Sequence, residues 1–346
     1  MRLLKSRHTS SLGRLSRSAP SGSSVALAAV LAGGAFLATT AAFVRAASKE
    51  SERANPPRGR SIEVDGVLLH YIEEGSGAAV VILHGNGAMA EEMSISGLIE
   101  ALAEEHRVIA FDRPGYGHSS RPRDRSWTPD RQAELILRAC DALHLDRPIL
   151  VAHSWATLVA VAAALRSPSA IRGLVLMSGY YYPTARADTA LLALPAVPVI
   201  GPLLRHTLSP LVARLAWPKL VAHVFSPQEV PERFNRRFPK WMALRPGQLR
   251  ASAEESGMMV PSAAGLQNTY GEISVPVAIL AGTDDRISDP SRQSARLAED
   301  IPNATLQLLP RLGHMLHYFA TREVVSAVSR LRHKGLTAAP RTASAA

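Results

Sequence analysis

A serine lies where an apolar segment of the chain gives way to a predicted helix. Residues 149–152 are apolar, Ser154 follows in the pentapeptide Ala-His-Ser-Trp-Ala, and helical periodicity begins at Ala156. When small residues flank such a serine, strand and helix approach closely and the hydroxyl projects from the bend. The same residue could instead serve only as the helix N-cap. We interpret Ser154 as a candidate nucleophile, an assignment that depends on a base and an acid elsewhere in the chain.

A serine hydroxyl needs a neighbouring base to accept its proton as it attacks. His314 follows a glycine in the loop after the apolar segment 304–309, and it is the predicted base. His317 is the alternative, although we expect it to lie within the helix that follows. His153 is adjacent to the serine in sequence, but within the turn its side chain should point elsewhere, so we interpret it as structural.

An acid must in turn orient the histidine and stabilise its charged form. Asp284 and Asp285 both follow the apolar segment 275–280. We assign this role to Asp285 and expect Asp284 to stabilise the turn. The serine, the acid and the histidine each follow a predicted strand. The carboxyl ends of the strands of an open parallel sheet form the edge where ligands bind, so these three residues are expected to meet there.

Two backbone N–H groups are needed to stabilise the negative oxygen that forms when a serine attacks a carbonyl. The residue after the nucleophile, Trp155, is predicted to supply one of them. Asn86 is predicted to supply the other, from the loop His-Gly-Asn-Gly that begins at His84. Flanking glycines allow a close backbone approach, although the same loop could be a simple glycine turn.

The elements that must position these residues alternate between apolar strands and helices. Such alternation predicts an α/β fold whose mostly parallel sheet is buried on both faces. A turn at Asp65-Gly66 predicts a hairpin at the start, and helices are expected at about 91–104, 129–143, 156–165 and 316–332. The eight predicted strands are 62–64, 67–72, 79–83, 107–111, 148–152, 172–177, 275–280 and 304–309.

The alternation is interrupted in the middle of the chain, which divides the body into segments. Residues 61–182 and 263–333 are predicted to form the two parts of one core. Residues 183–262 are rich in proline and in apolar residues, and are predicted to form a helical cap inserted between strands. Residues 334–346 are predicted to be a disordered tail.

The N-terminus carries a membrane signal. Residues 1–24 contain five basic and no acidic residues, and residues 25–44 carry no charge. Twenty uncharged, mostly apolar residues match the thickness of a bilayer, so we predict a single-pass transmembrane helix, followed by a polar linker at 45–60. The alternatives are a cleaved secretory signal or an organellar transit peptide. Basic residues flank both sides of the span, and we place the N-terminus in the cytoplasm and the body on the exported, periplasmic side.

Charge and composition exclude other classes of protein. The net charge is +10, of which residues 1–24 contribute +5 and the last sixteen residues +3, so the body carries only +2. Basic residues in the body do not cluster with aromatic ones, so we expect no nucleic-acid partner. Cys140 is the only cysteine and is interpreted as buried and structural. No phosphate-binding loop or metal motif is present, and we expect neither a cofactor nor a metal.

Several segments together resemble the α/β-hydrolase family over about residues 61–333. None is decisive alone, but all occur in the order that the family shows. The departures are Ala152 and Ala156, which stand where the family's nucleophile motif has glycine. The matching segments are HGNG at 84–87, DRPGYGHS at 112–119, AHSWA at 152–156, GTDDRI at 282–287 and GH at 313–314.

This resemblance implies a fold, a catalytic triad and a reaction. The fold would be the α/β-hydrolase fold with a cap, and the triad Ser154, Asp285 and His314 would transfer an acyl group to water in two steps. Asp112 and Arg113 would support the sheet edge. Haloalkane dehalogenases and epoxide hydrolases of this fold use aspartate as nucleophile, so the serine favours cleavage of an ester, thioester, amide or carbon–carbon bond.

We therefore expect a membrane-anchored, carboxylesterase-like serine hydrolase of small or apolar esters. An apolar cap over the serine would favour an apolar substrate and exclude water. A carbon–carbon bond hydrolase or a haloperoxidase-like enzyme could use the same triad. The alternative outside enzymes is a catalytically silent binding protein of the same fold.

Overall fold

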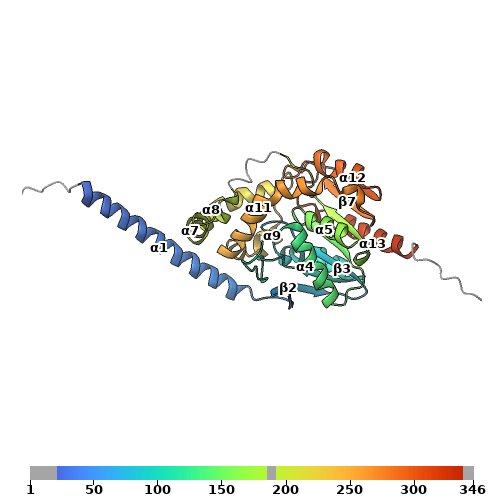
Figure 1. Cartoon of the computed structure of the whole chain (residues 1–346), viewed down its shortest axis with the longest axis horizontal. Helices are drawn as coiled ribbons and strands as arrows, with labels where there is room; N and C mark the ends of the chain where they lie inside the picture. The colour runs from blue at the N-terminus through green and yellow to red at the C-terminus, as the bar shows by residue number, and fades with distance from the viewer. Residues whose placement is uncertain (1–21, 185–191, 338–346) are drawn as a thin grey trace, which may run out of the picture.

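The computed structural model describes residues 22–184 and 192–337, which form an α/β body and one projecting helix (Figure 1). The strand order is β1-β2-β4-β3-β5-β6-β7-β8. β2 pairs antiparallel with β1 and β4, and all other neighbours are parallel, which confirms the predicted mostly parallel eight-stranded sheet. The strands are β1 Arg60–Val64, β2 Val67–Glu74, β3 Ala78–Leu83, β4 His106–Phe111, β5 Ile149–His153, β6 Gly173–Met177, β7 Val277–Gly282 and β8 Ala304–Leu309.

Helices cover both faces of the sheet. β5, β6 and β7 are wholly buried, as expected for parallel strands between two helical layers. One core cluster joins the sheet to α4, α5 and α12, and a second joins its other face to α2, α3 and α13. The bounds of these helices are α2 Ala90–Ile95, α3 Leu98–Ala103, α4 Pro129–Ala142, α5 Ala156–Arg166, α12 Arg296–Asp300 and α13 Thr321–Thr337.

The segment expected to form one helix at 91–104 is divided into α2 and α3. Gly97 separates them with a φ of 83°, a left-handed conformation that glycine adopts without steric strain. The helix expected at 316–332 also differs, because Leu316–Tyr318 form a 3-10 turn and α13 begins only at Thr321. Both differences lie within the predicted elements and leave the layer order unchanged.

A helical insert lies between β6 and β7 in the chain. We use this name for the described residues 192–266, which fall mostly within the segment predicted as a cap. The insert has its own apolar cluster, built around Trp217, Phe225 and Phe234, which extends to Met89 and Met315 of the body. Its helices are α7 Ile200–His206, α8 Leu208–Phe225, α9 Glu232–Arg237, α10 Lys240–Ala243 and α11 Pro246–Leu266.

The helix α1, Gly22–Ala54, projects from the body as a single rod and contacts α7, α8 and α10 of the insert (Figure 1). The predicted polar linker at 45–60 is therefore helical as far as Ala54, because alanine, lysine, arginine and glutamate favour helix until the chain reaches Pro56 and Pro57. Likewise, α13 continues to Thr337 into the predicted tail, since no proline intervenes before Pro340. Residues 1–21, 185–191 and 338–346 of the predicted segments lie outside the described residues.

Candidate active site

Ser154 lies between the end of β5 and the start of α5, at the bend that the sequence predicts. Its φ is 55°, in the left-handed region that a non-glycine residue occupies only under constraint. The turn is held by the Ser154 N–H, which donates to the carbonyl of Met177 at 2.9 Å. Ala152 and Ala156 are fully buried, and neither has a positive φ, so the bend does not need glycine at these positions.

His314 and Asp285 lie beside Ser154. Nε2 of His314 is 2.9 Å from Oγ of Ser154, and its Nδ1 is 2.8 Å from Oδ2 of Asp285. A carboxylate only accepts hydrogen bonds, so Nδ1 carries the proton and Nε2 can accept from the serine hydroxyl. The other carboxylate oxygen, Oδ1, accepts the N–H groups of Ile287 and Ser288 at 2.8 and 2.9 Å. The fold thus brings the three predicted residues together in hydrogen-bonding order.

The alternative acid and base lie in other environments. Asp284 is exposed to solvent, and its carboxylate accepts from the Thr283 hydroxyl. Nε2 of His317 is 2.8 Å from Oε1 of the buried Glu92, so its ring faces the α2 side rather than the serine. His153 is buried, and its Nε2 is 3.0 Å from the backbone carbonyl of His314, which ties β5 to the histidine loop.

The loop after β3 lies directly against the serine turn. A Cβ at Gly85 would lie 3.1 Å from Nδ1 of His153 and 3.2 Å from Cβ of Ser154, so only glycine permits this approach without displacement. The backbone N–H groups of Asn86 and Trp155 donate to no acceptor within the described ranges. Neither predicted amide is therefore engaged by another group in the described part of the chain.

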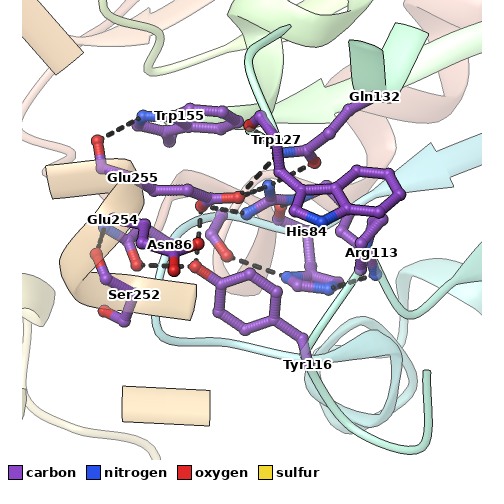
Figure 2. A network of polar contacts seen from close by, with 12 residues as sticks. His84, Asn86, Arg113, Tyr116, Trp127, Gln132, Trp155, Ser252, Glu254 and Glu255 are labelled. Carbon is purple, nitrogen blue, oxygen red and sulfur yellow. Dashed lines mark hydrogen bonds and ion pairs between the residues drawn. The ribbon is translucent and has the colours of Figure 1, made fainter. Parts of the chain in front are cut away.

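The His-Gly-Asn-Gly loop after β3 is also connected to a buried polar network that reaches the insert (Figure 2). Arg113 donates from its two terminal nitrogens to Glu255 of α11, at 2.5 and 2.9 Å, and both side chains are fully buried. Gln132 and Tyr116 donate to the same carboxylate at 3.0 and 2.7 Å. Nε of Arg113 donates to the carbonyl of His84 at 2.8 Å, so one guanidinium joins the insert to the loop.

The charges in this network fix the protonation states of its members. Burial raises the pKa of Glu255, but the adjacent charge of Arg113 outweighs it and holds the pKa below its ordinary value. Burial, reinforced by Arg113, lowers the pKa of His84 to about 4. Neutral His84 can donate from Nδ1 to the Gly85 carbonyl, which lies 2.8 Å away. Its Nε2 can accept the backbone N–H of Arg113, whose nitrogen lies 3.0 Å away.

Glu255 is the residue at this site that the sequence did not reveal. In an otherwise polar helical stretch, Ala-Glu-Glu-Ser is typical of a solvent-exposed face, and Glu254 beside it is indeed partly exposed. The resemblance assigned Arg113 to the sheet edge, but its partner is 142 residues away. No cluster of three or more His, Cys, Asp or Glu side chains suited to a metal ion occurs within residues 22–184 and 192–337.

The chain belongs to the α/β-hydrolase family. Residues 78–321 match the sequence profile described as the alpha/beta hydrolase fold, which is most of the chain. A putative carbamate hydrolase RutD from Variovorax paradoxus is 30% identical over 254 residues, covering 71% of this chain and 89% of that protein. The 2-hydroxymuconate semialdehyde hydrolase of Pseudomonas putida is 27% identical over 269 residues, covering 75% of this chain and 89% of its own length.

Two solved structures with the same fold are enzymes whose activities differ from each other. A membrane phospholipase A, described as a bacterial virulence factor, has a TM-score of 0.62 at 22% identity and covers 91% of this chain and 98% of its own. A meta-cleavage product hydrolase from Pseudomonas fluorescens has a TM-score of 0.64 at 23% identity and covers 81% and 99%. At these identities the similarity establishes the fold, and the enzyme homologues support a hydrolase.

Proposed function

We propose that the protein is a serine hydrolase that cleaves an ester-type bond through an acyl-enzyme intermediate. The observation that carries this proposal is the continuous chain of contacts from Ser154 Oγ to His314 Nε2 at 2.9 Å, and from His314 Nδ1 to Asp285 at 2.8 Å. A serine whose base is itself oriented by an acid is the arrangement that activates a hydroxyl as a nucleophile. The strained φ of Ser154 supports the same role, because such strain persists where the surrounding structure imposes it.

In the proposed mechanism, His314 Nε2 accepts the Ser154 proton as Oγ attacks the substrate carbonyl carbon. The backbone N–H groups of Trp155 and Asn86 stabilise the oxyanion. The tetrahedral intermediate collapses, and His314 donates its proton to the leaving alcohol. Water then attacks the acyl-enzyme and gives its proton to His314, which returns it to Ser154 as the acid is released. Asp285 stabilises the imidazolium during both steps.

The residues around the triad favour a substrate with a small or apolar acyl group. The apolar cluster of the insert includes Met89, which is close in sequence to the His-Gly-Asn-Gly loop, and Met315, which follows His314. Apolar walls beside the triad exclude water and strengthen the electrostatic contacts within the site. We therefore infer that the insert acts as a cap, as the sequence predicts.

Cleavage of a carbon–carbon bond is a second candidate, favoured by the 2-hydroxymuconate semialdehyde hydrolase relative. The two candidates share the triad, so a Ser154 variant does not separate them. Turnover of a vinylogous 1,5-diketone, measured beside a panel of aryl esters of increasing acyl length, does. Faster turnover of the esters, measured as kcat/KM, favours the esterase, and the reverse result favours the second candidate.

The proposal is tested by hydrolysis of an aryl ester by the full chain and by Ser154→Ala. Loss of turnover without loss of the folded state is expected, because the alanine cannot form an acyl-enzyme. Ser178→Ala is a suitable control, because Ser178 is also a buried serine after a sheet strand, but its hydroxyl has no hydrogen bond to His314 or Asp285 in the described structure. Full activity in Ser154→Ala, or loss of activity in the control alone, would contradict the assignment.

We also propose that α1 anchors the enzyme in a membrane. Residues 26–54 form a helix long and apolar enough to cross a bilayer, and it is mostly exposed. Phe43, near the end of its uncharged run, packs edge to face on Trp241 of the insert, with ring centroids 5.9 Å apart. Glu52 pairs with Arg245 of the insert at 2.9 Å. These contacts would hold the insert at the surface of the bilayer that α1 crosses.

The outer surface of the insert fits this position. Leu215 and Val212 of α8 are 82% and 62% exposed, and Val199 lies nearby in sequence with 87% exposed. Residues 192–228 contain no acidic residue but include basic ones. Apolar side chains with interspersed cations suit a membrane interface that carries anionic lipids. The similarity to a membrane phospholipase A extends beyond residues 78–321 and agrees with this location. We place the body on the exported side.

A further inference from the structure

Glu255 is a buried acid that the proposed mechanism does not use. It lies on α11 of the insert, its side chain has no exposed surface, and its carboxylate receives four donors from the body. Burying a charge is expensive unless it is paired and fully hydrogen-bonded, and here both conditions hold. The donors come from Arg113, Tyr116 and Gln132, which belong to the loop after β4 and to α4.

The first link runs from Glu255 to Trp155. The indole Nε1–H of Trp155 donates to the backbone carbonyl of Glu255 at 3.0 Å (Figure 2). The guanidinium of Arg113, held by the Glu255 carboxylate, lies over the same indole ring, 5.0 Å from its centroid. Trp155 is fully buried, so these contacts fix the orientation of its side chain. The backbone N–H of this residue is one of the two proposed oxyanion donors.

The second link runs from the same turn of α11 to Asn86, the other proposed donor. The Tyr116 hydroxyl lies 2.7 Å from Oε2 of Glu255 and 2.9 Å from Oδ1 of Asn86. Both oxygens are acceptors, so the one hydroxyl hydrogen is shared between the two residues and connects them. The amide nitrogen of Asn86 donates to the Ser252 carbonyl at 3.2 Å and to the Ser256 hydroxyl at 3.1 Å. One turn of one helix therefore holds the side chains of both proposed oxyanion residues.

We propose that Glu255 is a positioning residue that aligns the Trp155 and Asn86 amides, so that the insert sets the geometry of the oxyanion hole. The inference rests on the proposed function. Oxyanion donors act only when they are held at hydrogen-bond distance from the place where charge develops. A buried, fully hydrogen-bonded carboxylate resists displacement. The insert thereby contributes to the chemical step as well as enclosing the site.

The neighbouring Glu254 provides a matched control. It occupies the same helix, and its carboxylate pairs with Arg121 and Arg250 at 2.8 and 2.9 Å. It has no hydrogen bond to Asn86, Trp155 or Tyr116 in the described structure. Glu254→Gln and Glu255→Gln thus make the same chemical change one residue apart, with and without a connection to the proposed oxyanion donors.

The experiment measures kcat and KM for a soluble aryl ester and the rate at which a fluorophosphonate modifies Ser154, in the full chain. Glu255→Gln is expected to lower kcat and the phosphonylation rate together, by about 10- to 100-fold. Its KM should change little, because the ground state does not depend on the oxyanion contact. Glu254→Gln should keep kcat, KM and the modification rate within about threefold of wild type.

A folded Glu255→Gln variant with wild-type kcat would overturn the proposal, as would an equal loss in Glu254→Gln. If Glu255→Gln does not fold, Tyr116→Phe removes only the hydroxyl that bridges Glu255 and Asn86. It should fold and lose about tenfold in kcat; unchanged kcat would overturn the coupling. Ser154→Ala, measured in parallel, separates the two proposals. Loss of activity there with no effect of Glu255→Gln refutes only the positioning role, whereas activity in Ser154→Ala refutes the proposed function itself.

Discussion

Asp285 and Asp284 are neighbours in the sequence but face opposite environments. Asp285 has a fully buried side chain and lies 2.8 Å from Nδ1 of His314. Asp284 is exposed; its carboxylate accepts from the Thr283 hydroxyl and its backbone N–H donates to the Leu312 carbonyl. The turn after β7 therefore directs one aspartate side chain into the site and the other into the solvent. The same substitution at the two positions therefore tests whether Asp285 belongs to the triad.

Asp285→Asn is expected to lower kcat for an aryl ester by about 10³- to 10⁴-fold, because an amide can donate to Nδ1 and favours the wrong histidine tautomer. Asp284→Asn should leave kcat and KM near wild type. Steady-state kinetics of both variants provides the measurement. Equal activity of the two variants would contradict the assignment of Asp285.

The strain at Ser154 predicts an effect on stability that is separate from activity. Glycine adopts a φ of 55° at low cost, whereas alanine does not. Ser154→Gly should therefore be more stable than Ser154→Ala by about 1 kcal/mol, and both should be inactive. Chemical unfolding of the two inactive variants in detergent measures the difference. Equal stability would show that the turn is not strained at this residue.

The buried His84 predicts a dependence of stability on pH. Its pKa is lowered to about 4 by burial and by Arg113. In the unfolded chain the same imidazole binds a proton below about pH 6.5. The unfolded state thus gains protons that the folded state excludes, so stability is full above pH 6.5 and decreases as pH falls towards 4.

The loss attributable to His84 is about 3 kcal/mol over this range. Burial also lowers the pKa of His153, so the wild-type slope contains both contributions. His84→Gln should flatten the decline in the free energy of unfolding between pH 7 and pH 4.5 without abolishing it. Unfolding curves at several pH values test this. An unchanged slope would mean that His84 accepts a proton without unfolding.

The proposed membrane location can be tested with single cysteines. Burial raises the pKa of the native Cys140 thiol to about 12, so it should react little with maleimides. Fluorophores placed by Leu31→Cys on α1 and Leu215→Cys on α8 should be quenched by spin-labelled lipids in vesicles. Leu308→Cys on β8, also exposed, serves as the control and should not be quenched.

Each position answers a different question. Quenching at Leu31 alone would support the anchor and refute membrane contact of the insert. Quenching nowhere, together with an intact mass that lacks α1, would support a cleaved signal sequence. Protease protection of the body in inside-out membrane vesicles is expected if the body is on the exported side, and full digestion would reverse the orientation.

Much of the architecture could be predicted because it is encoded locally. Buried parallel strands are continuous apolar runs, and the serine turn, the His-Gly-Asn-Gly loop and the late aspartate and histidine each follow one of them. Their convergence follows from parallel strand order alone. The structure places Asp285 and His314 in the chain of contacts that ends at Ser154, and it pairs His317 with Glu92 instead.

What escaped prediction depends on contacts between distant segments. Glu255 reads as a surface residue until α11 is placed against Arg113, which no local pattern indicates. The break at Gly97 and the continuation of α1 to Ala54 depend on single-residue conformations and on where a helix meets its first proline. The insert is rich in proline, and its helices are set by the tertiary packing of its apolar cluster.

The most direct test of the account is the site at which a fluorophosphonate modifies the full-length protein, determined by mass spectrometry of its peptides. The account predicts one adduct, on Ser154, that appears in parallel with the loss of ester hydrolysis and is absent from His314→Ala. Inhibition with the adduct on another residue, or no modification of a folded protein that still hydrolyses esters, would contradict it.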